Sequence, residues 1–216
     1  MSLVFSPNGL KPQGRQEEAP YEGGFSTFQL TTNNTSAIAV GETVGLVGGS
    51  VVSLTANPTP GTLSANTLLG VVMGFNYIAP AGQPLPFHNS QILPANAVSA
   101  GYTNISVMVA VANGRNFSVQ ANGPVTLAQI GSGINLGGFN TANLTFKQSG
   151  IYADTATLNQ TSGNTTAWKI YQIDHSQDNL TTNNAGYVQT LASDLYTRII
   201  VVPQISATLF GIVGAQ

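Results

Sequence analysis

Short runs of alternating apolar and polar residues recur along most of this chain. The longest apolar run is LLGVVMGFNYI, residues 68–78, in which bulky and small side chains alternate. This period of two is typical of a β-strand. The run is too short for a helix that spans a membrane, which needs about 20 apolar residues in a row. We predict a central strand whose core face consists of Leu69, Val71, Met73, Phe75 and Tyr77. Gly70 and Gly74 flatten the other face, where we expect another strand or subunit to pack closely.

Other segments predict further strands by the same alternation. They are residues 25–30, 37–47, 50–54, 105–112, 115–120, 141–154, 166–174 and 196–204. Between two of them, Gly48-Gly49 predicts a two-residue hairpin turn. Two of these strands are predicted to present an apolar face, made of Ile105, Val107, Val109 and Val111 in one and of Phe117 and Val119 in the other. In a third, Trp168, Ile170 and Gln172 alternate with Lys169, Tyr171 and Ile173. One short helix is conceivable over residues 185–198, and the whole pattern indicates an all-β barrel or sandwich.

The first 28 residues differ from the rest of the chain. Five of the 14 charged residues crowd there among prolines and glycines, and neither a helical nor a strand period is visible. We predict an extended arm, 1–28, which either docks on a neighbour through Phe5, Leu10 and Tyr21 or is a disordered tail. A first β unit then covers 29–112. A second β region, richer in glycine, asparagine and threonine, covers 113–216, and its last strands either stay there or return to the first unit.

Charge is scarce for a chain of 216 residues. Asp, Glu, Lys and Arg make up 6% of the sequence, against roughly 25% in an ordinary domain. The net charge is -2, which offers no electrostatic footprint for nucleic acid or an anionic membrane. Weak self-repulsion favours association, and a neutral, asparagine-rich surface open to water is the alternative. Disulfides and thiolate metal sites are excluded because there is no Cys, and since no secretory signal is visible we expect folding in the cytoplasm of the producing cell.

Few residues suggest chemistry. His88 and His175 have no second metal-type ligand at a usable spacing, and no serine lies in a G-x-S-x-G motif. The glycine-rich segment 131–138 lacks the Lys-Ser/Thr of a phosphate-binding loop and is interpreted as a turn between strands. We therefore predict no enzyme activity, no cofactor and no metal site.

The order of features along the chain carries a resemblance. An opening FSPNGLKPQG (5–14) precedes AVGETVGLVGGSVV (39–52), the apolar run 68–78, VMVAVANGRNFSVQANG (107–123) and IGSGINL (130–136). This order resembles the capsid decoration, or cement, proteins of tailed bacteriophages. In that family a Gly-Asp/Glu turn, here Gly41-Glu42, precedes the central strand. A later family motif is matched by Val109, Val111, Phe117, Val119 and Gln120, although Asn113-Gly114-Arg115 stands where acidic residues are expected.

The resemblance implies a structural protein without enzymatic activity. Its fold would be a compact, β-tulip-like barrel, often trimeric, on the outside of an expanded phage head, where it bridges capsomers after assembly in the host cytoplasm. The implied partners are the major capsid protein and further copies of this chain. We expect the interface to include Phe5, Leu10, Arg15, Tyr21, Gly70 and Gly74. A receptor- or carbohydrate-binding module of a tail fibre or spike, a capsid or tail-tube subunit, and a hydrolase with a spatially assembled site are the alternatives.

Overall fold

A computed structural model of the chain describes residues 7–15, 24–58, 68–81, 90–112, 114–159, 166–174 and 197–204. These residues form β-strands in three antiparallel sheets, with a single 3₁₀ turn, η1 (Leu127–Gln129). The all-β prediction is therefore confirmed, as a sandwich-like packing of sheets. None of the described segments is a helix long and apolar enough to cross a membrane.

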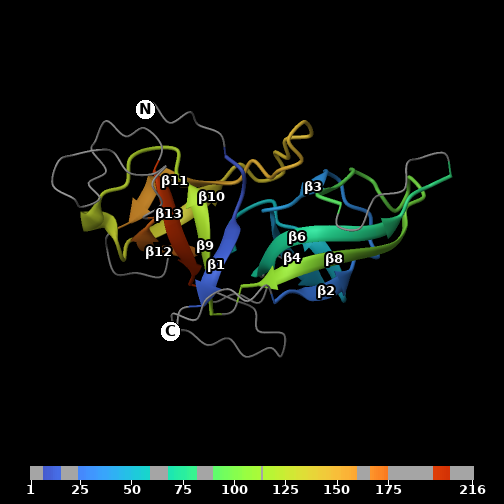
Figure 1. Ribbon diagram of the computed structural model, residues 1–216, viewed down its shortest axis with the longest axis horizontal. Coiled ribbons are helices and arrows are strands. Elements are labelled where there is room, and N and C mark those ends of the chain that lie inside the picture. Colours follow the sequence, from blue (N-terminus) through green and yellow to red (C-terminus); the bar gives the residue numbers. More distant parts are fainter. Residues whose placement is uncertain are drawn as a thin grey trace.

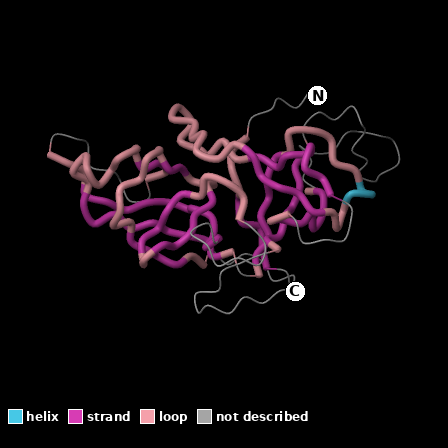
Figure 2. The backbone as a smooth tube through the Cα atoms, turned by 180° about the vertical axis from the view of Figure 1, so that it is seen from behind, coloured by secondary structure: helices cyan, strands magenta, loops and turns pink. Residues whose placement is uncertain are grey.

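The two large sheets lie next to each other along the long axis of the molecule (Figures 1 and 2). One has six strands in the order β1 (Lys11–Arg15), β9 (Arg115–Gln120), β13 (Arg198–Pro203), β12 (Trp168–Ile173), β10 (Gly133–Gly137) and β11 (Tyr152–Asn159). The other has five, in the order β2 (Ser26–Gln29), β8 (Thr103–Val111), β6 (Leu68–Ile78), β4 (Thr43–Val47) and β5 (Ser50–Ser53). The third sheet pairs β3 (Ile38–Ala39) with β7 (Ile92–Leu93).

The chain passes from the five-stranded to the six-stranded sheet between β8 and β9. β1, from the predicted arm, pairs with β9 at one edge of the six-stranded sheet, next to β13. Strands from both ends of the chain thus enclose β9. The division into separate units at 28 and 112 stays a prediction.

The predicted hairpin is confirmed. β4 and β5 pair from Val44 opposite Ser53 to Val47 opposite Ser50. Gly48 and Gly49 join the two strands with φ angles of 55° and 81°. A two-residue turn with two positive φ angles matches the twist of the flanking strands, and glycine adopts it without a steric cost.

Two hydrophobic clusters form the core. The first lies on the six-stranded sheet and includes the predicted pair Phe117 and Val119 together with Trp168 and Ile170. The second lies on the five-stranded sheet and includes the predicted Ile105, Val107 and Val109, whereas Val111 is half-buried. These core predictions are confirmed because residues two apart in a strand lie on the same side of it.

The prediction of one core face along β6 is wrong. Against β4 the strand has an extra residue at Leu69, and against β8 it has another at Met73. Each bulge shifts the alternation by one position. The first cluster therefore receives Leu68, Val71 and Met73, and the second receives Leu69, Val72, Phe75 and Tyr77.

Gly70 is required by the close approach of β8. A Cβ atom at this position would collide with the carbonyl oxygen of Ala110 and lie 2.7 Å from Cγ1 of Val109. The strand that we expected to pack against Gly70 is therefore β8 of the same chain.

A similar bulge breaks the predicted alternation of β12. Tyr171 is the extra residue opposite β13 and is exposed, and Ile173, not Gln172, is buried like Trp168 and Ile170.

Glycine was misleading in segment 131–138, where the predicted turn is in fact strand β10. A Cβ on Gly137 would lie 2.7 Å from Cζ of Tyr152, and one on Gly133 would collide with Thr166. These glycines make room for side chains of neighbouring segments. The conceivable helix at 185–198, up to residue 196, and both histidines lie outside the described residues.

Candidate interaction site

The structure does not gather the predicted interface residues on one surface. Leu10 is 1% exposed and belongs to the first core cluster. Gly70 and Gly74 are buried within β6, and Arg15 ends the edge strand β1. Phe5 and Tyr21 lie outside the described residues. Of these six residues, the glycines and Leu10 pack inside the single chain, and their role in an interface stays a prediction.

A different feature stands out on the surface. The segment from Gly138 to Gly150, here called the projecting loop, extends away from both large sheets (Figures 1 and 2). It carries Leu144 and Phe146, which are each 67% exposed and are the most exposed large apolar side chains among the described residues. Two such neighbouring side chains on a protruding loop are suited to insertion into a partner.

Hydrogen bonds within the loop fix its tip. The side-chain oxygen of Asn143 accepts hydrogen bonds from the backbone N–H groups of Thr145, at 3.0 Å, and Phe146, at 3.1 Å. The backbones of Asn143 and Gln148 exchange two further bonds, and Lys147 between them has a φ of 53°. Leu144 and Phe146 therefore lie within a closed turn that presents them together.

The predicted strand over 141–154 begins only at Tyr152, so the prediction is wrong for residues 141–151. The alternation of Leu144 and Phe146 with polar residues has the period of a strand. The side chain of Asn143, however, takes backbone N–H groups that a sheet would otherwise use. The sequence analysis therefore missed Leu144 and Phe146 as exposed residues. The signal that could have identified this turn is Asn143, which precedes the two N–H groups by two and three residues.

The base of the loop is held on the rest of the chain. A Cβ on Gly138 would collide with the carbonyl oxygen of Gly150, so the two ends of the loop touch. The N–H of Ser149 donates to the carbonyl oxygen of Val40 at 3.0 Å, beside a parallel bridge between Val40 and Gln148. The loop thus starts and ends at one place, next to β3.

Glu42 and Asn140 form a second attachment of the loop. Glu42 follows β3 and is completely buried. Its Oε1 accepts hydrogen bonds from the hydroxyl of Ser53 at 3.0 Å and the N–H of Asn140 at 3.3 Å, and its Oε2 accepts one from the N–H of Ala39 at 3.2 Å. Burial raises the pKa of Glu42, and these hydrogen bonds lower it by less.

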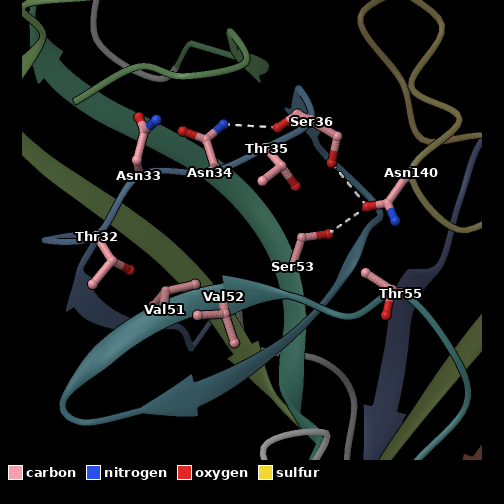
Figure 3. A pocket seen from close by; sticks show the side chains of 10 residues that line it. All are labelled: Thr32, Asn33, Asn34, Thr35, Ser36, Val51, Val52, Ser53, Thr55 and Asn140. Carbon is pink, nitrogen blue, oxygen red and sulfur yellow. Dashed lines mark hydrogen bonds between the residues drawn. The ribbon is translucent and has the colours of Figure 1, made fainter. Parts of the chain in front are cut away.

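The Asn140 side chain completes this attachment. Its Oδ1 accepts hydrogen bonds from the hydroxyls of Ser36, at 2.9 Å, and Ser53, at 3.2 Å (Figure 3). With a φ of 57°, Asn140 adopts a left-handed conformation that asparagine tolerates better than most residues. The network joins the loop to both β5 and the segment before β3.

A shallow polar pocket lies on the same network. It has a volume of about 200 Å³ and is lined by Thr32, Asn33, Asn34, Thr35, Ser36, Val51, Val52, Ser53, Thr55 and Asn140 (Figure 3). Several of these side chains already serve the fold, since the amide of Asn34 bonds the carbonyls of Ser36 and Pro94. The pocket offers hydroxyl and amide groups for hydrogen bonds but has no aromatic ring in its lining.

Titratable side chains are sparse in the described part of the chain. There, no three His, Cys, Asp or Glu side chains gather as metal ligands, and the ion pair between Arg198 and Asp174 spans 3.6 Å. No family model, curated protein or solved structure matches the chain. The arguments for its function therefore come from its own sequence and geometry.

Proposed function

We propose that this chain is a structural virion protein that decorates the outer surface of a phage capsid and cements it by bridging capsomers. The projecting loop carries the proposal, because it presents Leu144 and Phe146 to solvent at a fixed place. The order of sequence features shared with the decoration proteins of tailed phages and the scarcity of charge support it. The partners are the major capsid protein and two further copies of this chain in a trimer.

The energetics of the loop suit a clamp used in many copies. Complete burial of a Leu or Phe side chain contributes about 1.5 to 3 kcal/mol. Two thirds of that surface is still exposed here, so docking both residues adds about 2 to 4 kcal/mol per copy. A trimer engages several capsomers at once. Once one copy has bound, the other two bind at a high effective concentration, so the modest gain per copy gives much tighter attachment overall.

The test measures binding of the purified chain to expanded heads of the parent particle that lack decoration. Replacing Leu144 and Phe146 by Ala should weaken binding in a sedimentation assay by roughly 30-fold or more, since about 1.4 kcal/mol corresponds to tenfold. The matched control replaces Leu127 and Ile130, which are 49% and 42% exposed elsewhere on the surface. Equal binding by the loop variant and the wild type, or equal loss in both variants, would contradict the proposal.

The arm is tested by point substitutions rather than by deletion. Removal of residues 1–28 would take away β1 and the buried Leu10, and so would damage the fold itself. Replacing Phe5 and Tyr21 by Ala leaves β1 and Leu10 in place. If the arm lies along the capsid, this variant should bind heads more weakly while its melting temperature is unchanged, and light scattering should show whether the trimer persists.

The polar pocket favours one alternative, a carbohydrate-binding module of a tail fibre or spike. Eight of its ten lining residues carry hydroxyl or amide side chains, which suit the hydroxyl groups of a sugar. Sugar sites also use aromatic rings for stacking, and the pocket lining has none. Binding on a glycan array that is lost on replacing Asn140 by Ala would support this alternative over the capsid proposal.

A further inference from the structure

Glu42 is the single titratable residue among the fully buried side chains of the described residues. Its carboxyl lies where three segments meet: β3 through Ala39, β5 through Ser53 and the projecting loop through Asn140. Within the described residues, the groups that donate hydrogen bonds to the carboxyl are backbone N–H groups and a hydroxyl. The charged residue of the loop itself, Lys147, is exposed near the tip and is not among these contacts.

The burial of the carboxyl favours its neutral form. Glu42 is fully buried, and the groups that donate hydrogen bonds to it, two backbone N–H groups and one hydroxyl, carry no charge. A buried carboxylate without a cation beside it is costly. The raised pKa of Glu42, caused first by desolvation, agrees with this burial argument.

The neutral form also supplies a proton for the contact between Ser53 and Asn140. Ser53 has one hydroxyl proton but two acceptors within reach, Oε1 of Glu42 and Oδ1 of Asn140. If the carboxyl carries its own proton, Glu42 donates to the oxygen of Ser53, and Ser53 donates to Asn140. A continuous chain of hydrogen bonds then runs from the sheet into the loop.

We propose that Glu42, as a neutral acid, is a latch that holds the projecting loop on the five-stranded sheet, and that loss of its proton releases the loop. The latch belongs to the isolated chain, so it goes beyond the proposed function and does not depend on it. Its consequence is that the presentation of Leu144 and Phe146 responds to pH.

The direction of the effect follows from linkage. A carboxyl whose pKa in the folded chain exceeds its ordinary value of 4.5 stabilises the latched state fully below that ordinary value. This contribution is lost as the pH rises through the raised pKa, because ionisation then favours an opening that hydrates the carboxyl. The loop is therefore expected to open more at higher pH.

The first test is a carboxyl NMR titration of the wild-type chain labelled with ¹³C-glutamate. The sequence has four glutamates, Glu17, Glu18, Glu22 and Glu42, so the signals are few. Glu42→Gln assigns the signal of Glu42 by its disappearance. We expect Glu42 to titrate at higher pH than the other three. If Glu42 titrates together with them or below them, the proposal is overturned.

The second test measures hydrogen exchange of the backbone amides of Asn140 and Ser149 between about pH 4 and about pH 9, corrected for intrinsic rates. In the wild type, protection of both amides should fall about tenfold per pH unit once Glu42 ionises. In Glu42→Gln, whose side chain stays neutral at every pH, protection should not depend on pH. Amides of β9 and β13 are the internal reference.

Loop protection that stays constant while Glu42 ionises would refute the latch, and so would the same pH dependence in Glu42→Gln. A parallel loss in β9 and β13 would indicate global unfolding and would also count against it. If Glu42→Gln fails to fold, the wild-type chain alone still tests the latch, because the pH dependence of hydrogen exchange is compared between its loop amides and its sheet amides. Neither test uses heads, so failure of the latch and failure of the capsid proposal are separate results.

Discussion

The close approach of β6 and β8 at Gly70 leads to a quantitative prediction for Gly70→Ala. The added methyl would collide with the carbonyl oxygen of Ala110 and lie 2.7 Å from Val109. Val109 also belongs to the second core cluster, so neither neighbour moves without disturbing a packed region. Overpacking of this kind costs about 1 to 3 kcal/mol, and because a backbone atom is involved we expect the upper end of that range.

The assay is thermal unfolding followed by the fluorescence of Trp168, which is the single tryptophan and is fully buried. A loss of about 3 kcal/mol corresponds to a fall in Tm of roughly 6 to 12 °C for a chain of this size. The control is Gly48→Asn, at a φ of 55° with no atom within 4 Å of the added Cβ, and it should change stability by less than about 1 kcal/mol. If Gly70→Ala is as stable as the wild type, β8 does not lie against this glycine.

Two further substitutions test the tip of the loop and the core. Asn143→Ala removes the acceptor for the N–H groups of Thr145 and Phe146. Hydrogen exchange of these two amides should therefore accelerate by roughly tenfold or more. The control Asn143→Asp retains the acceptor and should preserve their protection. Ile134→Ala opens a cavity in the first cluster and should lower the free energy of unfolding by about 2 to 5 kcal/mol, and an unchanged unfolding midpoint would show that β10 does not lie in the core.

The sequence predicted most strands because their alternation is local. In β8 and β9, residues two apart lie on the same face, so Val107 and Val109 share one cluster and Phe117 and Val119 share the other. The bulges at Leu69, Met73 and Tyr171 depend on which strand lies alongside and how the two are in register. That pairing joins residues far apart in the chain, and a single sequence does not encode it visibly.

The candidate site was harder to predict for the same reason. Leu10 has the pattern of a docking residue in an irregular arm, yet its partners in the core come from β6, β9 and more distant segments. Phe146 has the pattern of a strand residue, yet a local side-chain bond from Asn143 places it on an exposed turn. The positions of Leu10 and Phe146 each depend on whether local or distant contacts are stronger. Composition and hydrophobic period do not show which contacts are stronger.

The apolar run of β6 is explained by the position of this strand between two cores. A strand at the surface keeps one polar face, but β6 sends Leu68 and Val71 into the first cluster and Leu69 and Val72 into the second. Its sequence therefore has no polar face over its first half, and it is as apolar as a membrane segment without being long enough for one. Alternation lets a single strand contact both cores, and the bulges decide which residues face each cluster, because each bulge shifts the alternation by one position. Gly70 lies between those two sets, where β8 comes too close for any side chain.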